Sequence, residues 1–363
     1  MTANAQYILD LPRSGYLGSL LLRISNSCAG AVHLTSELDR IVDFITKVEV
    51  IKNGSTIVKS LAGDAVQALA HFDQGVGVPD QWRTYSSNTQ WAYFVINFGR
   101  YLFDKDYGLD LGAANRVELK ITNTFTAATG WATSPAVDVI GKFYRGTDIN
   151  PFRGYMRSEE WRSWTTVANK TEYFELPTDM RIRRILLQTI SDRTNGIADC
   201  DPDDLMYTVK YGLKGHTMLV FNDSIHYLRF ANWYDYGREV LTSGQAYKTA
   251  DYGFPIGLAR QFGWGDGAGS GDGDPASTIP TIEATDDDTI TARSYEADHP
   301  INWISRGWGF HDMAVLRHDY SLDPTNWLDP EANKVVRLDI TTRNSAGAAD
   351  GTNKIILDRL VAG

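Results

Sequence analysis

The chain contains one phrase twice. It reads "LDLGAANRVELKIT" at residues 109–122 and "LDPEANKVVRLDIT" at residues 328–341, and the two copies align without a gap. A repeat of this kind indicates a duplicated structural unit. The identical positions are Leu109/Leu328, Asp110/Asp329, Ala113/Ala332, Val117/Val336, Leu119/Leu338, Ile121/Ile340 and Thr122/Thr341.

Apolar and polar residues alternate at the end of both copies. This period of two predicts a β-strand with one buried and one exposed face. The exposed positions change sign between the copies, because Glu118 is replaced by Arg337 and Lys120 by Asp339. The apolar positions are kept, so the phrase is expected to have a structural role.

Three further matches occur in the same order in both halves. Asp10-Leu11-Pro12 corresponds to Glu175-Leu176-Pro177, and the turn pairs Asn53-Gly54 and Lys214-Gly215 each separate two apolar runs, which is typical of a β-hairpin. "GDAVQALAHF", with Asp64 as the predicted N-cap, and "NDSIHYLRF", with Asp223, each predict a short helix. Four matches in one order predict two domains of the same fold.

The second half is longer than the first. Its first match begins at Glu175 where the first half has Asp10, but its closing phrase begins at Leu328 where the first half has Leu109, so it carries roughly fifty additional residues. We assign them to the stretch between Tyr252 and Pro300. It includes "GWGDGAGSGDGDPASTIP" and is rich in Gly, Asp, Ser and Thr, which predicts a long surface loop.

Strands dominate the remaining pattern, and the predicted helices are few and short. The sequence therefore predicts an all-β fold of two tandem eight-stranded jelly-roll sandwiches, with a few short helices in the connections. We expect an N-terminal jelly roll at 1–150, a linker at 151–170, and a C-terminal jelly roll at 171–363 with the insertion around 253–300. The predicted strands include Leu20–Ser25, Val42–Ile51, Thr56–Leu61, Trp91–Phe98, Val137–Tyr144, Ile185–Ile190, Met206–Tyr211, Thr217–Phe221 and Lys354–Val361.

The composition of the chain narrows the range of possible functions. The 363 residues carry a formal net charge of −10, which disfavours direct binding to nucleic acid, and 12% are aromatic, which suits sheets and broad interfaces. Cys28 and Cys200 are too few for a disulfide scaffold. The start of the chain does not resemble a secretory signal, and no run approaches the roughly 20 apolar residues of a membrane span, so we expect a soluble, cytoplasmic protein.

Four groups of residues could carry chemistry, and for each we favour a structural role. His311-Asp312 and His318-Asp319 lack a metal-binding pattern, and their spacing would place the two histidines on opposite faces of a strand. Asp266, Asp272 and Asp274 could bind Ca²⁺ but lack the spacing of an EF-hand loop. We interpret Asp199–Asp204 as a turn, and Glu159–Trp164, which mixes acids with Trp as carbohydrate sites do, as part of the linker.

Known motifs for phosphate, dinucleotide or nucleophile sites are not found in the sequence. The sequence therefore predicts no catalytic residue, no cofactor-binding residue and no metal site.

The duplicated plan resembles the double jelly-roll major capsid proteins of the lineage that joins adenoviruses to tailless, membrane-containing phages. The first half carries the most similar text, in "LPRSGYLGSLLLRI", "KVEVIKNGSTIVKSL" and "INFGRYLFDKDYGLDLGAANRVELKIT". The Gly- and Asp-rich insertion departs from the common plan, and the resemblance implies that it is a variable, outward-facing loop.

The resemblance implies a structural subunit without catalysis. Such a subunit forms a homotrimer, a pseudo-hexameric capsomer that tiles an icosahedral shell in the virion after assembly in the host cytoplasm. The implied partners are further copies of the chain, other capsid proteins such as a penton, and the internal lipid membrane that members often cover. Two alternatives stay open at this point: a tandem jelly-roll glycan amidase of the secreted type, and a carbohydrate- or receptor-binding module.

Overall fold

The structure is a computed structural model. It describes residues 1–2, 4–27, 40–74, 89–127, 131–132, 134–144, 151–191, 193–194, 197–198, 202–236, 240–248, 252–255, 262–267, 281–284, 289–293, 299–344 and 350–363. Within 193–202 and 240–306 the description concerns the backbone alone. Cys28, Cys200, Asp272 and Asp274 lie outside the described residues.

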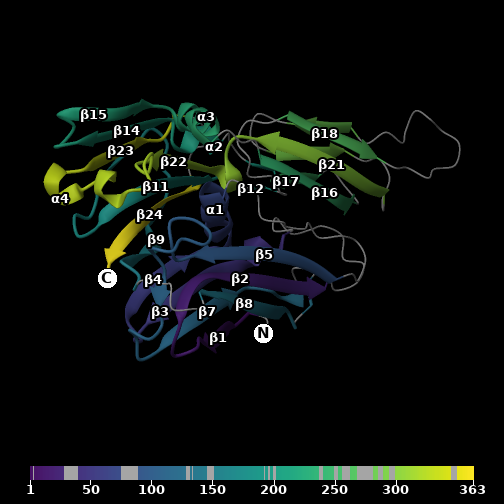
Figure 1. Cartoon of the computed structure of the whole chain (residues 1–363). Helices are drawn as coiled ribbons and strands as arrows, with labels where there is room; N and C mark the ends of the chain where they lie inside the picture. Colours follow the sequence, from purple (N-terminus) through teal and green to yellow (C-terminus); the bar gives the residue numbers. More distant parts are fainter. Residues whose placement is uncertain are drawn as a thin grey trace, which may run out of the picture.

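The described chain forms two β-sandwiches, one above the other in Figure 1. Each has its own buried apolar core, because the inward positions of its strands are Val, Leu, Ile and Phe. The first sandwich packs β1 (Gln6–Asp10), β7 (Val117–Asn123), β3 (Ile45–Lys52) and β4 (Thr56–Leu61) against β8 (Ala136–Tyr144), β2 (Tyr16–Ser27) and β5 (Thr89–Asn97), with the short β6 (Leu109–Asp110) paired to β2.

The second sandwich repeats this plan. It packs β10 (Thr171–Glu175), β23 (Arg337–Thr341), β14 (Thr208–Leu213) and β15 (Met218–Asp223) against β9 (Gly154–Thr165), β24 (Thr352–Ala362), β11 (Arg181–Ile190) and β22 (Met313–Arg317). A helix follows the hairpin in each half: α1 (Gly63–Gln74) and α3 (Ile225–Tyr236). The short elements are η1 (Ile41–Phe44), α2 (Pro202–Leu205), η3 (Phe310–Asp312), η4 (Pro324–Asn326), α4 (Pro330–Asn333), β12 (Arg193–Thr194) and β13 (Ile197–Ala198).

The duplication predicted from the sequence is present in the strand register. Gln6 pairs with Thr122 in the first half, and Thr171 pairs with Thr341 in the second, and the sequence matches place these two pairs in correspondence. Both hairpin turns place their two central residues at positive φ, which gives the type of turn that matches the twist of the flanking strands. Even a β-bulge recurs, between Leu17 and Ser19 in β2 and between residues 182 and 184 in β11.

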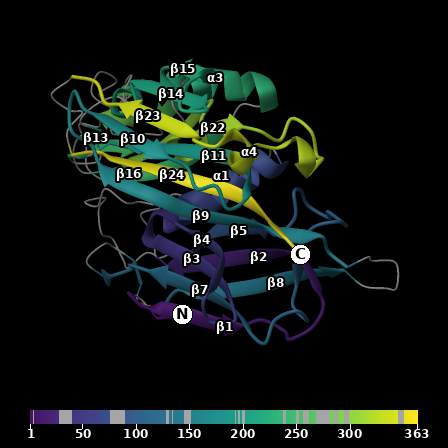
Figure 2. The ribbon, with the colours of Figure 1, turned by 90° about the vertical axis from the view of Figure 1, so that its left-hand side faces the viewer.

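The two halves share one sheet. β4 pairs in parallel with β9, and this joins the two four-stranded sheets into one eight-stranded sheet with the order β1-β7-β3-β4-β9-β24-β11-β22. Figures 1 and 2 show β9 beside β4 and β24. The predicted linker at 151–170 is therefore wrong for residues 154–165, which form a long strand at the centre of this sheet.

The insertion also differs from the prediction. The described backbone within it is not an irregular loop, because its strands, together with a strand on either side of it, form two three-stranded sheets. One has the order β16-β21-β18 and the other β17-β20-β19. Their strands are β16 (Val240–Lys248), β17 (Tyr252–Pro255), β18 (Phe262–Gly267), β19 (Thr281–Ala284), β20 (Thr289–Arg293) and β21 (His299–Gly307).

Three local predictions need correction. The strand predicted from Val42 begins at Ile45, because the preceding residues form the 3₁₀ turn η1. Asp64 is not an N-cap, since α1 begins at Gly63 and Asp64 lies in its first turn. When the helices are aligned from their first residues, Asp64 corresponds to His226, and not to Asp223 as in the sequence match. In the part of the chain that the structure describes, every helix is too short or too polar to span a membrane.

Candidate functional site

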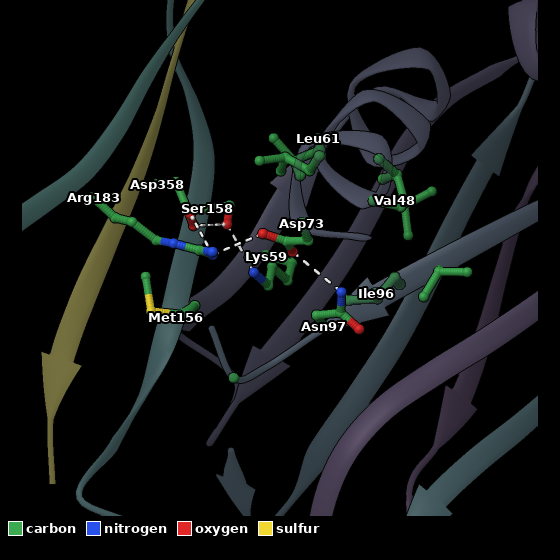
Figure 3. A pocket seen from close by; sticks show the side chains of 15 residues that line it. Val48, Lys59, Leu61, Asp73, Ile96, Asn97, Met156, Ser158, Arg183 and Asp358 are labelled. Carbon is green, nitrogen blue, oxygen red and sulfur yellow. Dashed lines mark hydrogen bonds and ion pairs between the residues drawn. The ribbon is translucent and has the colours of Figure 1, made fainter. Parts of the chain in front are cut away.

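The contact between the two sandwiches holds the densest group of buried charges among the described residues, and we call it the joint cluster. It consists of Lys59, Asp73, Ser158, Arg183, Arg184, Asp319 and Asp358. Lys59 on β4 and Asp73 at the end of α1 come from the first half, whereas the others come from β9, β11, β24 and the turn after β22. Figure 3 shows most of these side chains converging on a small cavity between the halves.

Two consecutive arginines form the centre of the joint cluster. Neighbouring residues of a regular strand point to opposite faces, but Arg183 is the extra residue of the β11 bulge, and both arginines point to the same carboxylates. Arg183 lies 2.8 Å from Asp73 and 2.9 Å from Asp319, and Arg184 lies 2.7 and 2.8 Å from the same two groups. The bulge thus places two positive charges on one side of the strand.

A chain of hydrogen bonds crosses the shared sheet. The Nζ of Lys59 donates to the Oγ of Ser158 at 2.7 Å, and that Oγ donates to Asp358 at 2.6 Å. Asp358 in turn lies 3.3 Å from Arg183. Three basic and three acidic side chains therefore meet in one buried volume, and Arg317, whose side chain is 20% exposed, adds an ion pair to Asp319 at its edge, 3.1 Å away. Each buried charge thus has a partner of opposite sign.

Burial and the neighbouring charges shift the pKa values of these groups in opposite directions. Burial favours the protonated form of Asp319, but Arg184 and Arg183 outweigh it and lower the pKa of Asp319 to about 2. Burial is the main cause of the lowered pKa of Lys59, and Asp358 and Asp73 counteract it. Asp319 is thus held as an anion, and the arginines are its partners.

A lysine beside a serine could in principle activate a nucleophile. Here the Ser158 side chain is 1% exposed and donates its own proton to Asp358, so a substrate could not reach its oxygen. The geometry suits a rigid connection and does not suit acyl transfer at this serine.

A second set of contacts reinforces the joint. Gln188 of β11 donates to Asp64 of α1 at 2.6 Å, and the Nε2 of His311 lies 2.8 Å from the amide oxygen of Gln67 on α1. Phe310 of η3 lies against the ring of His71, with ring centroids 5.3 Å apart. α1 is therefore held between its own sandwich and the second one (Figure 1).

No protein-family model and no curated protein sequence matches this chain. Solved structures do match. The STIV MCP superposes with a TM-score of 0.61 at 11% identity, covering 99% of this chain and 93% of that one. The PBCV-1 virus capsid, and PBCV-1 VP54 fitted into a reconstruction of the virophage Sputnik, each superpose with a TM-score of 0.55 at 9% identity, covering 99% of this chain and 90% of theirs.

This chain has the double jelly-roll fold. The likeness extends over both sandwiches, and the chain repeats its own strand order and register in the two halves. The fold predicted from the sequence is thereby confirmed.

The histidines singled out in the sequence are structural in this double jelly roll. His311 lies in η3 and His318 follows β22, so the two do not share a strand as the spacing had suggested. Burial, together with Arg40, lowers the pKa of His311 to about 3, and burial lowers that of His318 to about 4. His318 lies 3.1 Å from the hydroxyl of Tyr211, so each ring has one neutral hydrogen-bond partner.

The acidic stretches are dispersed over the fold. Asp203 and Asp204 lie in the one-turn helix α2 where a turn was predicted, and they pair with Arg229 and Arg343. Residues 199–201 lie outside the described residues. The backbone of Asp266 lies in β18. Among the described residues, no group of three or more His, Cys, Asp or Glu side chains could hold a metal ion.

The stretch Glu159–Trp164 serves the second core. Trp161 and Trp164 lie on the ring of Phe174, with centroids 6.2 and 4.8 Å apart, and Glu159 pairs with Arg157 and Arg359. Both Trp side chains are half-buried and pack against the second core, which gives the aromatic residues of this stretch a structural role.

The joint cluster was missed in the sequence. Its signal was present in "RIRRILLQTI" at 181–190, where two adjacent arginines interrupt an otherwise apolar strand. Charges inside such a strand require buried partners. The partners are 111 and 136 or more residues away in the chain, so the sequence could indicate the need for them but not their identity.

Proposed function

We propose that this chain is a viral major capsid protein, a structural subunit that builds an icosahedral shell by association with further copies of itself. The observation that carries the proposal is the internally duplicated double jelly roll, which superposes over 99% of its length on the STIV MCP and on the PBCV-1 capsid structure. The buried joint, with its paired charges, supports it, because a shell subunit needs its two sandwiches fixed relative to one another.

The duplication suggests how copies assemble. Three chains with two similar sandwiches each give six nearly equivalent lobes, and closed homotrimers need only one kind of contact between copies. The product is a capsomer of hexagonal outline, and such capsomers tile a flat facet. In this proposal the protein acts in the virion after assembly in the host cytoplasm, where a penton protein fills other positions of the shell.

An acidic subunit suits this role if a lipid membrane separates shell and genome. The net charge of −10 makes direct contact with nucleic acid unfavourable. None of the similar structures reported above is a glycan amidase, and no observation here favours a carbohydrate-binding role.

Self-assembly tests the proposal. The purified chain is expected to sediment as a trimer at micromolar concentration and to give hexagonal particles in negative stain. A chain that stays monomeric over the whole concentration range, and forms neither capsomers nor shells, would contradict the proposal.

A further inference from the structure

One face of the second sandwich is buried only because the first sandwich covers it. Leu186 of β11, Met313 and Val315 of β22 and Ile356 of β24 point out of their own sandwich, and each is at most 1% exposed. They belong to the core of the first half and not to that of the second. We call this set the covered face; α1 lies against it (Figure 1).

The first sandwich has the same face, and it is open. Leu186 pairs with Val315 on one side and Ile356 on the other, and the corresponding Leu21 pairs with Val95 and Ile140. Met313 corresponds in the same way to Tyr93. Ile140 is 60% exposed and Tyr93 is 38% exposed, and all four residues line an open cavity. We call Leu21, Tyr93, Val95 and Ile140 the open face.

The helices α1 and α3 differ in the opposite sense: side chains buried in the first half have exposed counterparts in the second half. α1 and α3 have the same length, and we align them from their first residues, Gly63 with Ile225. The alignment is supported by burial, because the buried Val66, Gln67 and Ala70 then correspond to the buried Leu228, Arg229 and Asn232. Ala65, Ala68 and Phe72 of α1 are buried, whereas the corresponding Tyr227, Phe230 and Tyr234 of α3 are exposed, Tyr234 by 77%. Three exposed aromatic side chains along one helix form an unusual surface for a protein that stays alone in water.

The strand that precedes each helix, β4 before α1 and β15 before α3, shows the same difference in exposure. The free edge of β4 is covered by β9 of the other half. The corresponding β15 pairs only with β14 among the described residues, and its Met218, Leu219 and Val220 are each about half exposed. An open, apolar edge strand is a ready surface for another chain.

We infer that the open face of the first sandwich binds α3 and the neighbouring edge of β15 on a second copy of this chain. The occupant is a second copy because the chain already contains the matching contact: the covered face on α1 is the same pair of surfaces, joined within one molecule. This inference rests on the proposed function and specifies the surfaces by which the copies meet.

The positions of the two surfaces fit a ring. α3 lies at one end of the molecule and β8 near the other in both views (Figures 1 and 2). The contact is therefore head to tail, since each copy uses its α3 on one neighbour and its open face on the other. A head-to-tail contact builds a closed ring when its rotation permits.

The contact between copies lacks the ion cluster of the joint. Gly18 and Ser19 occupy the places of Arg183 and Arg184, and the counterpart of Asp73 is Asp235, which is exposed and bonded to Tyr320. The open face does carry one exposed ion pair, between Arg23 and Asp138, two residues along from Leu21 and Ile140. The interface between copies would thus combine apolar and aromatic contacts with this single surface ion pair. It should be more readily reversible than the joint, which suits stepwise assembly.

Two single variants and their mixture test the inference. Ile140→Asp places a charge on the open face, and Tyr234→Asp places one on α3. Since both side chains are exposed, the monomer should keep its circular dichroism spectrum and its melting temperature. Each variant should trimerise at least about tenfold more weakly than the unchanged chain, because a charge would be buried in an apolar contact. Ile8→Asp on β1, at a site 51% exposed and outside both surfaces, is the matched control and should trimerise normally.

Mixing the two variants distinguishes a head-to-tail contact from a symmetric one. The Ile140→Asp chain keeps a functional α3 and the Tyr234→Asp chain keeps a functional open face, so one intact contact can form. Light scattering should then show a dimer of twice 40.5 kDa in the mixture and monomers in each separate solution.

The outcomes separate the two proposals. If the unchanged chain is trimeric and both variants trimerise equally well, the inference is wrong and the proposed function stands. A mixture that remains monomeric likewise overturns the head-to-tail contact. An unchanged chain that is itself monomeric overturns the proposed function and the inference together.

Discussion

At the scale of the residue, the joint cluster makes the two halves specific for one another. A buried ion pair stabilises a fold little in comparison with apolar packing, because both charges lose their hydration. Removing one partner is costly, however, because the other charge stays buried. We therefore expect Arg183→Ala to lower the free energy of unfolding by about 3–5 kcal/mol, since Asp319 and Asp358 keep their burial and lose a partner. Urea unfolding measures this difference.

Arg116→Ala is the matched control for this residue. Arg116 forms an ion pair with Asp10 at 2.8 Å, but its side chain is 55% exposed, and that of Asp10 is 61% exposed. Its second partner, Glu118 at 3.0 Å, would keep Lys120 at 3.7 Å after the substitution. The same loss of an arginine should cost less than about 1 kcal/mol at such a surface pair. Equal costs for the two variants would mean that the cluster is not energetically distinct from the surface.

His311 should make the stability depend on pH. Its pKa is lowered to about 3 by burial, whereas an unfolded histidine titrates near 6.5. The unfolded chain then binds more protons than the folded one between these values, so stability falls as the pH drops from about 6.5 towards 3. His318, with a folded pKa lowered to about 4 by burial, acts in the same direction between about pH 6.5 and 4, whereas Asp319, with a folded pKa of about 2, loses its contribution mainly below about 3.8. A variant of His311 is therefore needed to isolate its share.

His311→Asn tests this assignment. Asn tolerates the left-handed backbone found at this position, where φ is 54°. Urea unfolding at pH 7 and at pH 4.5 should show a smaller loss of stability for the variant than for the unchanged chain. An identical loss in both chains would show that His311 does not cause the acid sensitivity.

At the scale of the element, the sequence predicted the strands that occur in both halves and missed the strand that connects the two halves. The alternation in 117–122 and 337–341 indicates strands without knowledge of their neighbours, because one face of each is buried. β9 was missed because both of its edges are paired within the large sheet, and its sequence, "GYMRSEEWRSWT", carries charges at many positions. Those charges have partners, such as Arg359 for Glu159, that only the folded chain brings close.

The same limit applies to the bulge in β11. Its counterpart in β2 carries Gly18, so the repeat shows where an extra residue fits but not that an arginine there would connect two sandwiches. The strands of the insertion were missed for another reason. Their sequences, such as "FGWGDG" and "TITAR", lie in a stretch rich in Gly, Asp, Ser and Thr, whose composition is typical of a loop. Only the backbone pairing with neighbouring strands shows that they are strands.

At the scale of the whole molecule, the two sandwiches form one cooperative unit. Leu186 and Leu187 are adjacent on β11 and both are fully buried, yet Leu186 belongs to the first core and Leu187 to the second. Replacing either by Ala should lower stability by about 2–5 kcal/mol through the lost packing and the cavity left behind. Because β11 borders both cores, we expect a single calorimetric transition in the unchanged chain and in both variants, at a lower temperature in each variant. Two separate peaks, with Leu186→Ala shifting only one and Leu187→Ala only the other, would show that the sandwiches melt independently and that the joint does not couple them.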